Sequence, residues 1–199
     1  AEYFYNMVRL HKPKRIVEIG SGMSTMLAQE ALTALRKTDS AYLCKHICIE
    51  PYEMPWLERL ERVEVLRELV EDIDVNVFSS MESGDILFID SSHVIRPQGD
   101  VLTVFLSILP RLQSGVLVHI HDIFSPRDYP KEWLVDDVRL WNEQYLLEAF
   151  LTSNKDFEIV GALNYLKYSE HNVLLSEKCP VYGLDSESYE PGSFWIRRK

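Results

Sequence analysis

Four acidic residues stand at or near the ends of apolar runs in this 199-residue chain. They are Glu18, Glu50, Asp90 and Asp122, and each run is rich in Val, Ile, Leu or Phe. Such runs are typical of buried strands, and ligands of open α/β sheets bind beyond the carboxyl ends of the strands. Four neighbouring carboxylates would repel one another without a cationic partner. We therefore expect these acids to bind a ligand or a cation.

The first acid precedes a glycine-containing turn, Gly20-Ser21-Gly22. Gly20 permits a sharp turn, Gly22 allows the backbone to approach a ligand, and the helix expected to start near Ser24 offers unpaired N–H groups. A strand, a glycine turn and a helix together are typical of a dinucleotide- or nucleoside-binding unit. The third glycine of the dinucleotide pattern is missing, and Glu18 would repel a diphosphate. A ligand with a cationic or amino group suits the turn better, and an ordinary strand-to-helix turn is the alternative.

The second acid, Glu50, follows the turn by roughly 30 residues within one βαβ unit. A carboxylate at this place can accept hydrogen bonds from both hydroxyls of a ribose. A solvated strand end is the alternative. Beyond the third apolar run stand further acids, of which Asp72 or Asp74 could cap a helix.

The other two acids, Asp90 and Asp122, end the fourth and fifth predicted strands. If these strands are neighbours, their backbones lie about 4.8 Å apart, so the carboxylates could share a proton or a hard cation such as Mg²⁺. A histidine ligand would shift the preference toward a transition metal. His93 and His121 are candidate bases, since the ordinary histidine pKa is about 6.5. Together with Asp122 they form the candidate catalytic set, although His93 could instead cap a helix.

The elements that would position these residues alternate between strands and helices. Apolar runs predict strands at 16–19, 46–51, 63–70, 84–90, 115–122, 157–160 and 193–197. Longer periodic segments predict helices at 2–11, 24–36, 97–113 and 133–152, with 164–177 ambiguous. This alternation predicts a Rossmann-like α/β fold with about seven mostly parallel strands, helices on both faces and an antiparallel last strand.

Composition narrows the kind of protein further. The length suits a single domain over residues 1–199, and an upstream segment is expected to be missing because the chain begins inside a predicted helix. The net charge of −10 argues against nucleic acid or an anionic membrane as a partner. No run approaches the roughly 18 apolar residues that span a bilayer. No signal peptide is visible, and three cysteines suggest free thiols, so we expect a cytoplasmic protein.

Three motifs carry a resemblance to a known family. The form Glu18-Ile19-Gly20-Ser21-Gly22 resembles the first motif of class I S-adenosylmethionine-dependent methyltransferases. Asp90-Ser91-Ser92-His93 and the run from His121 to Pro130 resemble motifs of a small bacterial group. That group is akin to the macrocin-type sugar O-methyltransferases and the cephalosporin-hydroxylase-like proteins, some of which bind Mg²⁺. The resemblance extends from Arg15 to about Trp133.

The resemblance implies transfer of the sulfonium methyl group of S-adenosylmethionine to an oxygen of a small molecule or sugar. The implied cofactor-binding residues are Glu18, Gly20, Ser21, Gly22, Ser24, Glu50, Asp72 and Asp90. In the family the residues after the third strand border the adenine, so the resemblance implies that Glu71 or Asp72 accepts a hydrogen bond from the adenine amino group. Asp90 and Asp122 are the implied Mg²⁺ ligands, although Ile123 stands where the family has an Asn or a second acid. A nicotinamide-dependent oxidoreductase and a catalytically silent cofactor-binding or scaffold protein are the alternatives. The sequence identifies neither the acceptor nor the oligomeric state, a homo-oligomer included.

Overall fold

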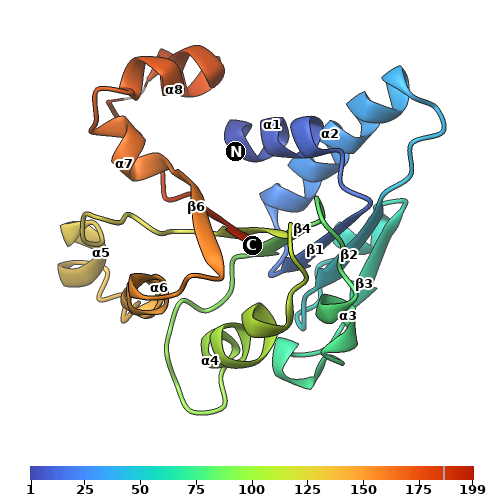
Figure 1. Ribbon diagram of the computed structural model, residues 1–199, viewed down its shortest axis with the longest axis horizontal. Coiled ribbons are helices and arrows are strands. Elements are labelled where there is room, and N and C mark those ends of the chain that lie inside the picture. The colour runs from blue at the N-terminus through green and yellow to red at the C-terminus, as the bar shows by residue number, and fades with distance from the viewer. Residues whose placement is uncertain (186) are drawn as a thin grey trace.

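The computed structural model of the protein describes residues 1–185 and 187–199. The described residues form one seven-stranded sheet in the order β3-β2-β1-β4-β5-β7-β6 (Figure 1). The strands are β1 (Arg15–Ile19), β2 (Lys45–Ile49), β3 (Val63–Leu66), β4 (Ile86–Ile89), β5 (Leu117–Ile120), β6 (Phe157–Ala162) and β7 (Phe194–Arg198). β7 runs antiparallel to both of its neighbours, β5 and β6, and the pairs among β1 to β5 are parallel. The predicted Rossmann-like sheet is confirmed.

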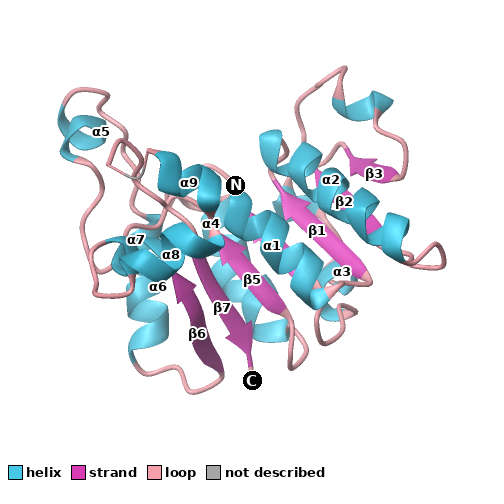
Figure 2. Ribbon diagram, turned by 90° about the horizontal axis from the view of Figure 1, so that it is seen from above, coloured by secondary structure: helices cyan, strands magenta, loops and turns pink. Residues whose placement is uncertain are grey.

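Helices cover both faces of this sheet (Figure 2). On one face lie α1 (Glu2–His11), α2 (Met23–Thr38), α8 (Asn172–Lys178) and α9 (Pro180–Leu184). On the other lie α3 (Asn76–Ser79), α4 (Asp100–Thr103) with the π-helical turn Val104–Ile108, and α6 (Glu143–Thr152). The short helices α5 (Lys131–Val135) and α7 (Leu163–Lys167) and the 3-10 turns Leu57–Arg59, Val70–Asp72 and Leu109–Arg111 complete the chain. Among the described helices, none has the length and hydropathy needed to span a membrane.

The two faces follow from the alternation of side chains along each strand. In β4, Ile86 and Phe88 pack in the same cluster as Phe4 of α1. Leu87 packs on the opposite side, in the same cluster as Phe105. The parallel strands are therefore buried on both faces, which explains why they are apolar without a polar side. Their carboxyl ends meet at one edge of the sheet.

The predicted helix over 133–152 is wrong. Two short helices, α5 and α6, replace it, with residues 136–142 between them. Val138 adopts a left-handed backbone with φ +52°, which a β-branched residue takes only at a cost, and this interrupts the helix. Val135, Val138 and Leu140 are exposed, so the apolar pattern there does not continue a buried stripe.

The loop after β5 is held in place by the start of α6. The Gln144 side chain accepts a hydrogen bond from Phe124 N at 2.7 Å and donates one to Arg127 O at 2.8 Å. The hydroxyl oxygen of Tyr129 accepts a hydrogen bond from Gln144 N at 3.0 Å. These contacts make the loop a rigid connection between β5 and α6.

Candidate functional site

A cavity of about 270 Å³ lies at the carboxyl ends of β1, β2 and β4. Its polar wall includes Gly20, Glu50, Glu71, Asp90 and Ser92. The cavity lies on the sheet edge where the parallel strands end, as the recurrence of acids predicts. It therefore brings together residues from four separate parts of the chain.

Glu50 joins this cavity to the glycine turn. The residue is 5% exposed, and its two carboxylate oxygens accept hydrogen bonds from Ser21 N at 3.2 Å and Tyr52 N at 3.0 Å. Each carboxylate oxygen has two lone pairs, so both can accept a further hydrogen bond. The side chain is thus fixed in place and retains capacity for a ligand with paired hydroxyl groups.

The two acids after β3, Glu71 and Asp72, lie in different surroundings. Glu71 lines the cavity, and its carboxylate lies 3.4 Å from the guanidinium of Arg96, another lining residue. Asp72 is exposed and is not among the residues that line the cavity. Of the two residues considered for an adenine contact, the structure brings only Glu71 to the cavity.

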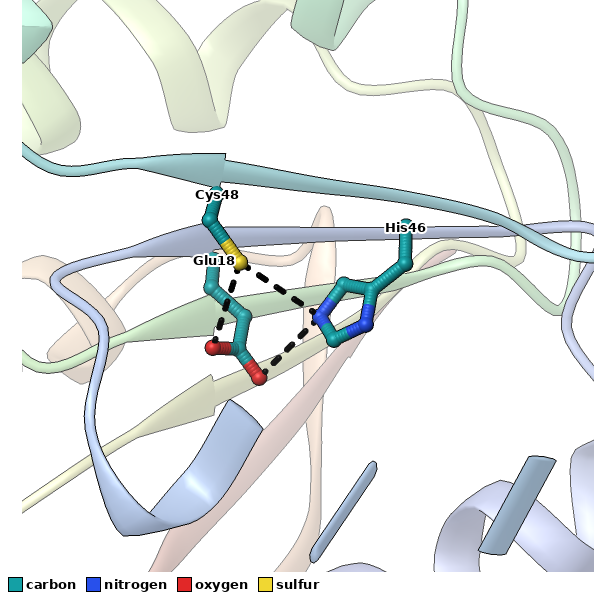
Figure 3. A group of neighbouring side chains, drawn as sticks. All are labelled: Glu18, His46 and Cys48. Atoms are coloured by element: carbon teal, nitrogen blue, oxygen red, sulfur yellow. Dashed lines mark hydrogen bonds and ion pairs between the residues drawn. The ribbon is translucent and has the colours of Figure 1, made fainter. Parts of the chain in front are cut away.

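Glu18 lies beneath the glycine turn and not in the cavity wall (Figure 3). Its fully buried carboxylate accepts a hydrogen bond from the Thr25 hydroxyl and lies 3.4 Å from His46 Nε2. The Thr25 hydroxyl oxygen in turn accepts a hydrogen bond from Gly22 N at 3.3 Å. Because side chains alternate along a strand, Glu18 points to the same face as Ile16, under α2. Its contacts hold the turn and the start of α2 together.

Cys48 completes this buried cluster, with its sulfur 3.8 Å from Glu18 Oε2 and 3.8 Å from His46 Nε2. Burial, reinforced by the charge of Glu18, raises the pKa of the Cys48 thiol to about 12. Without a bound cation the thiol is therefore protonated. His46 Nδ1 lies 2.7 Å from the Gln29 amide nitrogen. The cluster is accounted for as an internal hydrogen-bond network.

Three further residues expected to bind cofactor do not line the cavity: Ser21 and Gly22 of the turn, and Ser24 in the first turn of α2. Gly20 does line it, with φ +83°, and a Cβ atom there would lie 1.9 Å from the carbonyl oxygen of Asp90. Gly22 is extended, with φ −170°, and a Cβ atom there meets no atom within 4 Å. Only Gly20 is therefore required by the fold itself.

This difference gives a prediction about stability. Gly20→Ala should lower the free energy of unfolding by about 2–4 kcal/mol, because it combines an unfavourable φ with a backbone clash. Gly22→Ala, the matched control, should change it by less than about 1 kcal/mol. Urea unfolding followed by circular dichroism measures both. Equal effects at the two positions would contradict the structure of the turn.

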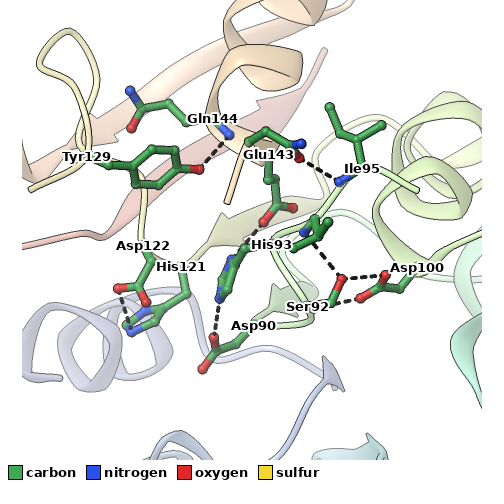
Figure 4. Close-up of polar contacts among 12 residues, drawn as sticks. Asp90, Ser92, His93, Ile95, Asp100, His121, Asp122, Tyr129, Glu143 and Gln144 are labelled. Atoms are coloured by element: carbon green, nitrogen blue, oxygen red, sulfur yellow. Dashed lines mark hydrogen bonds and ion pairs between the residues drawn. The ribbon is translucent and has the colours of Figure 1, made fainter. Parts of the chain in front are cut away.

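Beyond the cavity, His93 lies between two carboxylates (Figure 4). Its Nδ1 lies 2.9 Å from Glu143 Oε2 and its Nε2 lies 3.3 Å from Asp90 Oδ1. Burial lowers the pKa of His93, but the hydrogen bonds and charges of these two carboxylates outweigh burial and raise it to about 10. Burial raises the pKa of Asp90, yet the His93 hydrogen bond and the charges of His121 and His93 hold it below its ordinary value. The imidazole is thus a cation that donates from both nitrogens.

Glu143 is the functional candidate that sequence reasoning missed. It is fully buried in the first turn of α6, 50 residues from its partner His93. The predicted long helix placed it in the middle of a helix, where an acid is ordinary. Asn142, a favoured residue at a helix start, was the available signal that a new helix begins there.

His121 and Asp122 lie on the other side of this group, from the end of β5. His121 Nε2 lies 3.5 Å from Asp122 Oδ1, and burial raises the pKa of Asp122 despite the opposing charges of His121 and His93. Ligand atoms of Asp90, His93 and Asp122 all lie within 4.8 Å of one another. As expected, β4 and β5 are neighbouring strands, and the acids that follow them, Asp90 and Asp122, lie close together. Both His121 and Asp122 also line a second cavity, of about 540 Å³.

His119, two residues before His121, is a structural residue. It is buried, its Nε2 lies 2.8 Å from the Ser193 hydroxyl, and burial holds its pKa well below the ordinary histidine value. The ring stacks on Phe88 with a centroid distance of 4.2 Å. It is therefore a neutral core side chain.

Comparison with known proteins places this geometry in a family. A family model described as a methyltransferase domain matches residues 17–123. A sequence comparison with curated proteins finds no match.

Solved structures share the fold at low identity. An O-methyltransferase from Bacillus cereus, solved with S-adenosylhomocysteine (SAH), has a TM-score of 0.57 and 14% identity, covering 100% of this chain and 80% of its own. CmcI with magnesium and S-adenosylmethionine has a TM-score of 0.51 and 15% identity, with coverage of 98% and 69%. CalS11, a TDP-rhamnose 3′-O-methyltransferase, has a TM-score of 0.55 and 12% identity, with coverage of 98% and 76%.

The family match spans more than half of the chain and includes the glycine turn, Glu50, Asp90 and Asp122. It agrees with the sheet order and with the ligand-sized cavity at the strand ends. The chain belongs to the methyltransferase domain family and is a class I S-adenosylmethionine-dependent transferase.

Proposed function

We propose that this enzyme transfers the methyl group of S-adenosylmethionine to a hydroxyl oxygen of a small molecule, with sugars as one candidate class. One observation carries the proposal. The cavity beside Glu50 and the cavity beside His121 lie on either side of the Asp90–Asp122 pair. This arrangement suits a nucleoside cofactor on one side and an acceptor on the other. Relatives of known name, the Bacillus cereus and CalS11 enzymes, are O-methyltransferases.

In this proposal the cofactor lies along the strand ends. Glu50 accepts from the ribose hydroxyls, and Glu71, in place of the exposed Asp72, accepts from the adenine amino group. The methionine portion lies over the turn at Gly20 to Gly22, toward Asp90. Glu18 and Ser24 act indirectly, through the Thr25 contact and the start of α2 that fix the turn.

The acceptor hydroxyl would lie in the second cavity and lose its proton to His121. The Nδ1 atom of His121 is buried without a hydrogen-bond partner among the described residues, so the proton would reach Nε2. Asp122, 3.5 Å from that nitrogen, would stabilise the resulting imidazolium. Holding the hydroxyl in line with the sulfonium methyl group supplies most of the rate.

His93 suits a different role from that of base. It already carries a proton on each nitrogen, so it has no free lone pair to accept one. We assign it the positioning of Asp90, through the ion pair that Glu143 supports from behind.

The Asp90–Asp122 pair also fits a magnesium ion. Mg²⁺ prefers oxygen ligands and keeps several waters, so two carboxylates suffice to hold it. The imidazole of His93 does not complete the set, because both of its nitrogens face carboxylates. When bound, the ion would supply positive charge near the acceptor oxygen.

The metal proposal predicts that Mg²⁺ binds the SAH-loaded protein and that Asp122→Asn weakens this binding at least about tenfold, by removing one charged ligand. Isothermal titration calorimetry with MgCl₂ measures it, with Asp72→Asn as the control for loss of an exposed charge. Absence of binding heat at millimolar Mg²⁺ would contradict the proposed magnesium site.

The cofactor proposal is tested by calorimetry with S-adenosylmethionine and SAH. We expect saturable binding of both, and competition between them. Folded protein that binds neither at millimolar concentration would overturn the proposal. The oxidoreductase alternative predicts instead that reduced nicotinamide cofactor binds and changes its fluorescence.

A further inference from the structure

We infer that the second cavity takes an apolar, aromatic acceptor that carries a hydroxyl group and no anionic group. The inference rests on the proposed function, because it names the acceptor class of that same site. The cavity has a volume of about 540 Å³, which suits a small organic molecule. It lies beside His121 and Asp122, and its other walls come from α1, α8, α9 and the residues before β7.

Apolar and aromatic side chains form most of the cavity wall. Leu163, Leu175 and Val181 contribute aliphatic surface, and Tyr3 and Tyr182 contribute rings. Aromatic side chains favour offset or edge-to-face packing with another ring. The hydroxyl oxygen of Tyr182 is buried and has no hydrogen-bond partner among the described residues, so this side chain offers the cavity its ring and no exposed polar atom. A polyhydroxylated sugar would leave most of its hydroxyl groups unpaired against such a wall.

Apart from His121, the ionisable side chains of the described cavity wall that carry a formal charge at neutral pH are acidic: Glu2, Asp122, Asp185 and Glu190. No described lining residue is a lysine or arginine. Lys167 of α7 lies 3.0 Å from Glu190, so these two charges offset each other and the excess negative charge comes from the other three acids.

Two of the lining acids differ in how the protein holds them. Glu2 accepts hydrogen bonds from Val181 N at 3.0 Å and Tyr182 N at 2.8 Å, so its side chain is fixed at the start of α9. Asp185 is exposed and forms no ion pair among the described residues.

This charge pattern would repel a phosphate or carboxylate on the acceptor. It also separates this chain from a relative of similar fold. The acceptor named for CalS11, TDP-rhamnose, carries a diphosphate. A site for such a molecule needs cationic partners, and the described lining residues offer no lysine or arginine for this. Similar folds therefore do not imply a similar acceptor.

Three phenols of similar size but different charge test the inference. They are 4-ethylphenol, which is neutral, tyramine, which is cationic, and 3-(4-hydroxyphenyl)propionate, which is anionic. Each is titrated into SAH-saturated protein by calorimetry. We expect the neutral and cationic phenols to bind at least about tenfold more tightly than the propionate.

Charge reversal at the rim identifies the cavity as the binding site. Asp185→Lys, at an exposed position outside the proposed catalytic group, should strengthen propionate binding by about threefold to tenfold. Glu61→Lys makes the same change of net charge at an exposed position beside β3, near the opposite edge of the sheet. This variant should leave propionate binding unchanged.

The inference is overturned if the propionate binds as tightly as the other two, if no phenol binds, or if Asp185→Lys and Glu61→Lys act alike. The proposed function fails separately, if SAH itself gives no binding heat. In that case the phenol series, repeated without SAH, still tests the charge preference of the cavity.

Discussion

Replacing Glu50 with alanine is expected to lower the affinity for SAH by at least about 100-fold. The carboxylate would accept hydrogen bonds from both ribose hydroxyls, and each bond to a charged group contributes about 1.5–3 kcal/mol. The substitution also removes the acceptor for Ser21 N and Tyr52 N, which loosens the turn beside the cavity. Calorimetric titration with SAH measures the change.

Two variants separate a direct contact at Glu50 from a general effect. Glu68→Ala removes an exposed acid from the same region and should leave SAH affinity within about twofold, since an exposed side chain contributes little. Glu50→Gln keeps a hydrogen-bond acceptor and should fall between wild type and Glu50→Ala. If Glu50→Ala binds SAH within threefold of the wild-type affinity, with an unchanged free energy of unfolding, Glu50 does not contact the ribose.

Replacing His93 with leucine is expected to lower the free energy of unfolding by about 3–5 kcal/mol. The substitution leaves the carboxylate of Glu143 buried without its cationic partner, and an uncompensated buried charge has a cost of this size. Chemical denaturation in urea measures the loss.

The double variant His93→Leu/Glu143→Leu is the internal control. Removing both charges eliminates the unpaired carboxylate, so the double variant should be more stable than His93→Leu alone. A double variant at least as unstable as the sum of the two single variants would show that the pair does not interact as the structure has it. SAH binding by the double variant then reports how far Asp90 depends on His93 for its position.

Local patterns predicted much of the fold and the cofactor side of the site. The apolar run before Gly20 and the periodic segment after it predict a strand and a helix without any tertiary information. The position of Glu50 within one βαβ unit was sufficient to predict a place at the sheet edge, where the structure has it. The acids Asp90 and Asp122 meet because consecutive parallel strands, β4 and β5, are neighbours.

The remaining features depend on tertiary contacts that no local pattern encodes. The pairing of His93 with Glu143 joins residues 50 positions apart, and the break at Val138 is what brings α6 into place. Side-chain direction decides between Glu71 and Asp72, since a 3-10 turn points neighbouring residues to different sides. The burial of Glu18 could have been predicted from the sequence, because side chains alternate along a strand and Glu18 therefore lies on the same face as Ile16.

The crystal structure of the protein with SAH tests the central claim most directly. We expect the ribose hydroxyls to donate hydrogen bonds to Glu50, the adenine to lie near Glu71, and the sulfur to face the cavity beside His121 and Asp122. A nucleoside bound away from Glu50, or a sulfur separated from the second cavity by the protein itself, would contradict it.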